Sequence, residues 1–251
     1  MTEINFYERF ATLAAAESYT VKGLSAEEGI GIYNEKRLHR VLKRTFCDNE
    51  NFFEIKVGRY TADVLCDGHI YEIQCASFAP LTDKIGYYLN ETDNFVTVVH
   101  PLVVKRKIIR ADRESGEISY VRSSPKKAHL EDILPKLYYL RDFIGHARFS
   151  VTVALVEVEE YRYSEAVRYR KSGKYDNEVF PTKLVELVEL REVADYVEFL
   201  PAELIGKEFS AADYQPHTRL RGRDLYSALN LLSHIGLIDK RTEGRRAWYR
   251  S

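Results

Sequence analysis

A tight hairpin is predicted where residues 62–74 read ADVLCDGHIYEIQ. Asp67-Gly68 is a strong signal for a two-residue turn, because such turns need residues that tolerate positive φ. With that turn in place, Asp63 stands directly opposite Glu72 on the returning strand. Directly opposed residues have Cβ atoms roughly 4.5–5.5 Å apart. The hairpin therefore brings two carboxylates side by side.

The setting of this carboxylate pair indicates a bound cation. Like charges in opposed positions destabilise a sheet unless something neutralises them. Apolar residues cover both faces of the two strands, namely Val64, Tyr71 and Ile73 on one side and Leu65 and Ile70 on the other. A charge buried in such a setting needs a partner. Magnesium suits this place, because it is commonly held by one or two carboxylates together with phosphate oxygens of a substrate.

Gln74 completes the candidate cluster, because the two-residue period of a strand places it on the same face as Glu72. The competing interpretation is a solvated edge hairpin. In that case Asp63 begins its strand near the solvent, and Glu72 and Gln74 lie on an exposed face. Glu54, on the preceding strand, is a further acidic candidate outside the hairpin.

The elements around the hairpin predict an α/β fold. Helical periodicity marks residues 6–17, 25–29, 33–46 (with Asn34 as N-cap), 81–89 and 130–144 (despite Pro135). Strand patterns mark residues 52–57, 62–66, 69–76, 95–99, 103–110, 117–122 and 149–158, and the run 95–99 suits a buried parallel strand. A loop is predicted over 164–181, and residues 184–190 fit a strand or a helix. This order is typical of an α/β domain with a mixed sheet.

Residues 201–251 predict a second, smaller domain. A short helix over 209–213, with Ser210 as N-cap, precedes a longer helix over 223–235 that ends at Gly236. Two strands follow, over 237–241 and 246–250. Helix, helix and hairpin is the order of a winged helix-turn-helix domain, and the run LSHIGLI at 232–238 resembles the ending of many recognition helices.

The charge of this C-terminal region favours a nucleic-acid partner. Between residues 215 and 251 there are eight Arg or Lys against three Asp or Glu, although the whole chain has a formal net charge of −1. The candidate DNA contacts stand at the start of the longer helix (Arg219, Arg221 and Arg223) and on the wing (Lys240, Arg241, Arg245 and Arg246). The alternative is a winged helix that mediates protein contacts or dimerisation, since a fold alone does not fix function.

Residues 30–100 resemble the PD-(D/E)xK, or restriction-endonuclease-like, nuclease superfamily. Its signature is an Asp at the start of one strand, a hairpin, and Glu-x-Lys on the next strand, which here reads Asp63 and then Glu72-Ile73-Gln74. The whole chain is also similar to a bacterial family of uncharacterised proteins that shares the runs 32–36, 72–74 and 124–127.

The resemblance implies hydrolysis of DNA phosphodiester bonds with Mg²⁺ or Mn²⁺. It implies metal ligation by Asp63, Glu72 and the main-chain carbonyl of Ile73, and it adds Glu35, on the helix before the strands, as an acidic catalytic candidate. The competing interpretation is a Glu35 on the solvated surface of the helix, which is where a single helical Glu more often lies. Gln74 replaces the usual Lys and can orient a water but carries no charge, so catalysis would depend more on the metal. By analogy with members that cut two strands, a homodimer is expected.

Three functions stay open at this point. The first is an endodeoxyribonuclease that a winged helix guides to duplex or branched DNA. The second is a non-catalytic DNA-binding regulator with a degenerate nuclease fold, and the third is a protein that binds or processes RNA. The expected organisation is a helical extension over 1–30, a nuclease-like domain over 31–200 and a winged-helix domain over 201–251.

Composition limits the class of protein. The 251 residues are 45% hydrophobic and 30% charged, which is ordinary for a globular protein. No apolar run approaches the ~20 residues that a membrane span needs, and the first residues do not read as a signal peptide, so we expect a cytoplasmic protein without a membrane partner. Cys47, Cys66 and Cys75 fit neither a disulfide framework nor a zinc site, and we expect them to be reduced and mostly buried.

Overall fold

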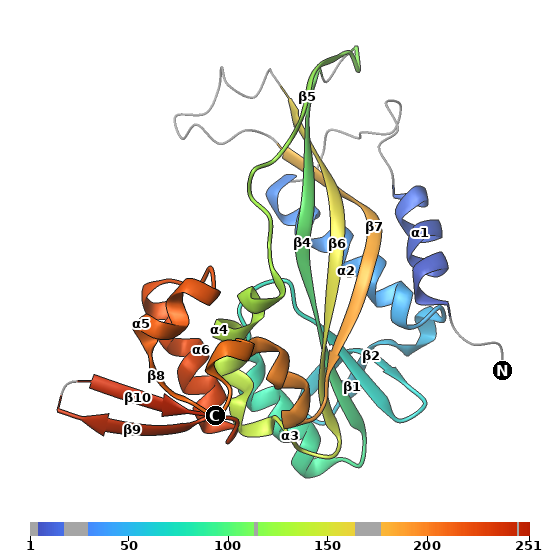
Figure 1. The fold of residues 1–251 in the computed structure, drawn as a ribbon. Helices are drawn as coiled ribbons and strands as arrows, with labels where there is room; N and C mark the ends of the chain where they lie inside the picture. The colour runs from blue at the N-terminus through green and yellow to red at the C-terminus, as the bar shows by residue number, and fades with distance from the viewer. Residues whose placement is uncertain (1–4, 18–29, 113–114, 164–176, 245) are drawn as a thin grey trace. The chain divides into compact units, whose positions relative to one another are not determined.

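The computed structural model describes residues 5–17, 30–112, 115–163, 177–244 and 246–251. In this described part, a seven-stranded mixed sheet is flanked by helices (Figure 1), which confirms the predicted α/β class. The strand order is β1-β2-β3-β4-β6-β7, with β5 paired to β4. The strands are β1 Phe53–Val57, β2 Tyr60–Cys66, β3 His69–Ile73, β4 Phe95–Ala111, β5 Ile118–Ser123, β6 Phe149–Tyr163 and β7 Asn177–Leu190.

The chain forms two compact units, each assembled from separate segments. The first unit comprises Met1–Phe53, Pro101–Ala128 and Ala154–Leu187, and the second comprises Glu54–His100, His129–Val153 and Val188–Ser251. The long strands β4, β6 and β7 pass through both units. Residues 201–251 belong wholly to the second unit, so a separate C-terminal domain stays a prediction.

The hairpin of β2 and β3 lies in the second unit and has the predicted register. Val64 pairs with Tyr71 in an antiparallel ladder. Asp67 and Gly68 have φ values of 52° and 75°, the positive values that the predicted turn needs. On its other side β3 pairs in parallel with the first part of β4, which confirms the parallel strand expected at 95–99.

β4 is much longer than predicted. It joins the runs 95–99 and 103–110 in one strand that passes through Pro101. The ladder with β3 ends at Val99, so the missing N–H of Pro101 costs no hydrogen bond to β3. The antiparallel pairing of β4 with β5 confirms the hairpin expected between 103–110 and 117–122.

Two later strands also exceed their predicted limits. β6 continues to Tyr163, and β7 shows that residues 184–190 are a strand. β7 also includes residues 177–181, which were expected in the loop. The remainder of that loop, residues 164–176, lies outside the described residues.

The single helix predicted over 130–144 is wrong. This part of the second unit consists of three short pieces: the 3-10 helix η3 Leu130–Ile133, the α-helix α4 Leu134–Leu137 and the 3-10 helix η4 Tyr138–Phe143. Pro135 lies in the first turn of α4, where the absence of its N–H is tolerated. A proline within a longer helix would have broken the hydrogen-bond pattern. The helix expected at 81–89 is present as α3 Thr82–Glu91.

The C-terminal part of the second unit contains two helices and a small sheet. The elements are β8 Glu208–Ser210, α5 Ala211–Tyr214, α6 Gly222–His234, β9 Asp239–Glu243 and β10 Arg246–Arg250, with strand order β8-β10-β9. The side chain of Ser210 accepts a hydrogen bond from the N–H of Asp213, which confirms it as N-cap. Gly236 follows α6 with a φ of 78°, as a glycine that ends a helix does. The three-residue strand β8 was not predicted.

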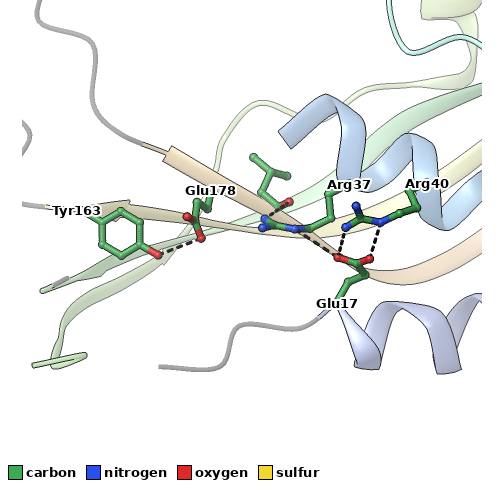
Figure 2. A network of polar contacts seen from close by, with 6 residues as sticks. Glu17, Arg37, Arg40, Tyr163 and Glu178 are labelled. Atoms are coloured by element: carbon green, nitrogen blue, oxygen red, sulfur yellow. Dashed lines mark hydrogen bonds and ion pairs between the residues drawn. The ribbon is translucent and has the colours of Figure 1, made fainter. Parts of the chain in front are cut away.

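In the first unit, α1 Phe6–Ala16 packs against α2 Ile30–Phe46. The carboxylate of Glu17 joins them by accepting from Arg40 at 2.6 Å and pairing with Arg37 at 3.6 Å (Figure 2). The assignment of Asn34 as N-cap is wrong, because α2 begins at Ile30 and Asn34 lies within it. The helix expected at 25–29 lies outside the described residues.

The structure bears on two predictions from composition, which concern membrane-spanning helices and the state of the cysteines. Among the described helices, none has the length and apolar character needed to cross a bilayer. The three cysteines form no disulfide. Cys47 is buried as expected, but Cys66 and Cys75 are only half-buried, so the expectation of mostly buried thiols holds for Cys47 alone.

Candidate functional site

The hairpin places Asp63 and Glu72 close together in the second unit. Oδ2 of Asp63 accepts a hydrogen bond of 2.8 Å from the N–H of Ile73. Glu72 is 2% exposed and Asp63 is half-buried. The negative charge of Asp63 is near enough to raise the pKa of Glu72. The two carboxylates singled out in the sequence are therefore neighbours in the fold.

A lysine from α3 joins this pair. Nζ of Lys84 lies 2.6 Å from Oε2 of Glu72, and both side chains are largely shielded from solvent. Lys84 was not a predicted site residue, but the helical period carries the signal. It falls on the same stripe as the buried Leu81, Ile85 and Tyr88, at the spacing of a core-facing helix surface. A charged residue on such a stripe needs a charged partner.

Burial raises the pKa of the Glu72 carboxyl to about 7, although Lys84 opposes the shift and Asp63 adds to it. Burial also raises the pKa of Tyr88, whose hydroxyl lies beside Glu72. Oε1 of Glu72 and the hydroxyl of Tyr88 are buried and complete no hydrogen bond within the described part of the chain. A buried polar atom without a partner costs about 1–3 kcal/mol, and a charged one costs more. The Tyr88 hydroxyl is nevertheless close enough to Glu72 to oppose the rise in its pKa, so Oε1 is buried with an incomplete hydrogen bond.

The side chain of Gln74, the third residue of the predicted cluster, forms its hydrogen bond elsewhere. Its Nε2 donates to the carbonyl of Ser77 at 2.8 Å, and β3 ends one residue earlier. In the described residues Gln74 forms no hydrogen bond with Asp63 or Glu72. The structure thus brings the two carboxylates together with Lys84 in place of Gln74.

The main chain at Gln74 is held by a buried histidine that was not predicted as a site residue. Nδ1 of His100 donates to the Gln74 carbonyl at 2.5 Å, and Nε2 of His100 accepts from Nζ of Lys136 at 2.8 Å. Burial lowers the pKa of His100 to about 4, and Lys136 lowers it further. The imidazole is therefore neutral at pH 7, and it fixes the backbone directly after the Glu72 strand.

The carboxylate pair fits a magnesium ion by its donor chemistry. Two carboxylates, one with an unpartnered buried oxygen, form the kind of incomplete set that Mg²⁺ completes with water and phosphate oxygens. Among the residues that the structure describes, no group of three or more His, Cys, Asp or Glu could hold a metal ion. The resemblance to the PD-(D/E)xK superfamily implies Asp63, Glu72 and the main-chain carbonyl of Ile73 as protein ligands. Lys84 donates to Oε2 of Glu72, and Oε1 completes no hydrogen bond.

The two outlying acidic candidates belong to the first part of the chain. Glu35 lies in α2, and its side chain lies outside the described part. Glu54 is exposed on β1 and has a positive φ of 52°. The described residues place neither carboxylate beside Asp63 and Glu72, so both stay predictions.

Residues 36–194 match a protein family described as a domain of unknown function, DUF8091. The chain belongs to the DUF8091 family. The match covers the carboxylate hairpin, Lys84 and His100, and it ends before residues 201–251. Comparison with curated proteins gave no match, and neither did comparison with solved structures. The DUF8091 description assigns no activity, so any function must be argued from the site itself.

Beyond the DUF8091 match, α6 has one buried and one exposed face. Leu225, Leu229 and Leu232 are buried. Arg223 and Tyr226, on the opposite side, are exposed, and Tyr226 is 53% exposed. The exposed face of α6 thus begins with an arginine.

The two arginines before α6 are engaged within the protein. The N–H of Arg219 donates to Glu131 at 2.7 Å, and its guanidinium contacts His129. The guanidinium of Arg221 donates to the carbonyl of Thr218 at 2.6 Å. These contacts position the loop before α6. All three arginines are exposed, but the side chain of Arg223 forms no hydrogen bond with a described residue.

On the predicted wing, the basic side chains differ in how they are hydrogen-bonded within the protein. Arg241 forms two hydrogen bonds with Glu208, of 2.7 and 2.9 Å, whereas Nζ of Lys240 donates to Asn230 on α6 at 2.8 Å. Arg246 is exposed on β10. Arg245 lies outside the described residues.

Proposed function

We propose that this DUF8091 protein is a metal-dependent nuclease that hydrolyses DNA phosphodiester bonds in a restriction-endonuclease-like domain. One observation carries the proposal: buried Glu72 lies close enough to Asp63 for that charge to raise its pKa, and its Oε1 completes no hydrogen bond while Lys84 donates to Oε2. A second carboxylate nearby weakens the Lys84–Glu72 ion pair, because like charges raise the cost of keeping Glu72 ionised. A magnesium or manganese ion between the two carboxylates would offset that cost.

Asp63 and Glu72 would hold the ion, with the Ile73 carbonyl as the third protein ligand. When bound, Mg²⁺ would polarise the phosphate and make the attacking water more acidic. Lys84 would provide the positive charge that the superfamily places two residues after the Glu, where this chain has neutral Gln74. An ammonium group in this shielded site would stabilise negative charge on the phosphate more strongly than one in water.

Glu72 must lose its proton before it can bind a cation. Since its pKa is about 7, metal affinity should rise as the pH passes from 6 to 8. His100 would act as a positioning residue, because it holds the main chain at Gln74 and so the neighbouring Ile73 carbonyl.

Residues 201–251 would form a winged helix that delivers DNA to this site. The arrangement of α5, α6 and the β8-β10-β9 sheet is the order of elements in that fold. The exposed face of α6 would enter the major groove, and Lys240 and Arg246 would contact phosphates. A cytoplasmic location and a homodimer belong to the same proposal.

Metal titration tests this assignment without requiring a known DNA substrate. Wild-type protein and Asp63→Asn should be titrated with Mn²⁺ at pH 8 by calorimetry and by electron paramagnetic resonance. We expect one saturable site per chain in the wild type and its loss in Asp63→Asn. Equal binding by both proteins would remove Asp63 from the metal site.

The second candidate is a DNA-binding regulator without catalytic activity. The 2.6 Å contact between Lys84 and Glu72 favours it, because that lysine neutralises the buried carboxylate without a metal. This candidate predicts DNA binding that is the same in EDTA and in Mg²⁺, with no saturable Mn²⁺ site. Competition by RNA over duplex DNA would point to RNA as the partner.

A further inference from the structure

The first unit contains a basic pocket remote in sequence from the carboxylate hairpin and from α6. Its volume is about 580 Å³, and its lining includes Arg106 of β4, Arg162 of β6, and Lys126 and Lys127 of the segment after β5. All of these residues belong to the first unit. Four cations around one pocket require an explanation, because like charges that face each other repel.

Two of the cations are fixed by one buried carboxylate. Oε2 of Glu160 accepts from Nη1 of Arg106 at 2.7 Å, and Oε1 accepts from Nε of Arg162 at 2.7 Å. Burial favours the neutral form of Glu160, but the hydrogen bonds from Arg162 and Arg106 outweigh it and lower the pKa. Glu160 is therefore charged at pH 7. Each guanidinium is held in place and keeps donors for a further acceptor.

The two lysines are presented by a segment that is fastened at both ends. The N–H of Ser124 donates to the carbonyl of Arg106 at 2.7 Å, and the N–H of Ala128 donates to the carbonyl of Val103 at 3.0 Å. Between these anchors, the hydroxyl of buried Ser124 accepts from the N–H of Lys126 at 3.2 Å. The backbone that carries Lys126 and Lys127 is thus set along β4 before any ligand arrives.

On the opposite face of β4 and β6, positive and negative side chains are paired one to one. Nζ of Lys105 lies 3.0 Å from Glu157, and Nζ of Lys107 lies 2.9 Å from Glu159. On that face each lysine has its own carboxylate. Around the pocket, by contrast, Glu160 is one carboxylate among four cations, and the ammonium groups of Lys126 and Lys127 form no ion pair with a described residue. Among the described residues, the strands therefore gather more positive than negative charge on the pocket face.

We propose that this pocket binds consecutive phosphate groups of a nucleic-acid backbone. Among the residues that the structure describes, no aromatic side chain lines the pocket, so these residues offer a base no ring to stack on, and they would hold a ligand through its phosphates. Guanidinium groups in a fixed orientation suit bidentate phosphate contacts, and lysines add point charges. The proposal goes beyond the nuclease, because it needs neither the metal nor the C-terminal helix.

The test compares two double variants that remove the same charge from the same unit. Lys126→Ala/Lys127→Ala empties the pocket of its lysines, and Lys105→Ala/Lys107→Ala removes two exposed lysines from the other face. Binding of fluorescent single-stranded and duplex oligonucleotides is measured by anisotropy in EDTA at several salt concentrations. We expect the pocket variant to bind at least about tenfold more weakly at low salt. The slope of log K against log salt should become shallower by about 1.5, since each lost phosphate contact removes roughly 0.7–0.9.

The control variant should change affinity by less than about twofold. If both double variants lose affinity equally, the effect is one of overall charge and the proposal is wrong. The proposal is also wrong if the pocket variant keeps the wild-type affinity. Tripolyphosphate serves as a competitor that shares the phosphate chemistry but is not a nucleic acid. If it binds the wild type while both double variants hold oligonucleotides as tightly as the wild type, the pocket takes a free polyphosphate and the nucleic-acid assignment is wrong.

Discussion

The ammonium nitrogen of Lys84 lies 2.6 Å from Oε2 of Glu72, so a cation from α3 already stands beside the carboxylate pair of the β2–β3 hairpin. This contact separates the two candidate functions. In the nuclease, Lys84 acts together with a metal ion on the phosphate. In the regulator, the same lysine replaces the metal and silences the site.

Lys84→Met should reduce DNA cleavage at pH 8 by about 100-fold, because one preorganised charge at a reacting phosphate is commonly worth a factor of this order. The substitution also removes the group that holds down the pKa of Glu72, so that pKa should rise above 7. Initial cleavage rates between pH 6 and 9 measure both effects. Lys84→Arg, which keeps the charge, should retain more activity than Lys84→Met. Equal rates for wild type and Lys84→Met would exclude a catalytic role for this lysine.

The buried carboxyl of Glu72 should make the metal-free protein less stable as the pH rises. Its folded pKa of about 7 exceeds the ordinary value of 4.5, so the folded state binds the proton more tightly than the unfolded state. The contribution of the Glu72 carboxyl to the free energy of unfolding is fully present below pH 4.5, and it is lost as the pH rises through about 7. Urea unfolding in EDTA at pH 5 and pH 8 should show wild type losing about 2–3 kcal/mol relative to Glu72→Gln. A constant difference between the two proteins would contradict the raised pKa.

The two faces of α6 should respond differently to truncation. Leu229 is fully buried, and Leu229→Ala should lower the free energy of unfolding by about 2–5 kcal/mol, as removal of core leucines does. Tyr226 is exposed, and Tyr226→Ala should change the free energy of unfolding by less than about 0.5 kcal/mol. Urea unfolding of both variants checks the assignment. A large loss in Tyr226→Ala would mean that the proposed DNA face is packed against protein.

Arg223 and Arg241 provide a matched pair for the DNA interface. Arg223 is exposed at the start of α6, whereas Nε and Nη2 of Arg241 both donate to Glu208. Arg223→Ala should weaken duplex binding about tenfold, and Arg241→Ala should weaken it by less than about threefold, because breaking the Glu208 pair offsets any phosphate contact. Anisotropy in EDTA measures both. The opposite order would place the interface on the strands instead of the helix.

The hairpin could be predicted from sequence because its determinants are local. Asp67-Gly68 tolerates the positive φ of a two-residue turn, and that turn alone sets the register that brings Asp63 near Glu72. The caps Ser210 and Gly236 were predictable for the same reason, since each acts within a few residues of the chain.

Features that depend on distant segments were not predictable in this way. In the sequence, Lys84 is indistinguishable from a surface lysine except for its position among the apolar residues of α3. Its partner Glu72 lies on β3, and only the tertiary structure brings the two together. The link from Gln74 through His100 to Lys136 joins three elements far apart in the sequence. The runs 95–99 and 103–110 were predicted as two strands, but they form one strand through Pro101, which lies just beyond the ladder with β3.

The decisive measurement is cleavage of supercoiled, linear and branched DNA in Mg²⁺ or Mn²⁺ by wild type and by Asp63→Ala. We expect cleavage by the wild type, none by Asp63→Ala, and similar DNA binding by both proteins in EDTA. Cleavage by Asp63→Ala at the wild-type rate would contradict the carboxylate site. Absence of cleavage by the wild type, with duplex binding retained in EDTA, would contradict the nuclease and leave a DNA-binding regulator in which Lys84 stands where a metal would bind.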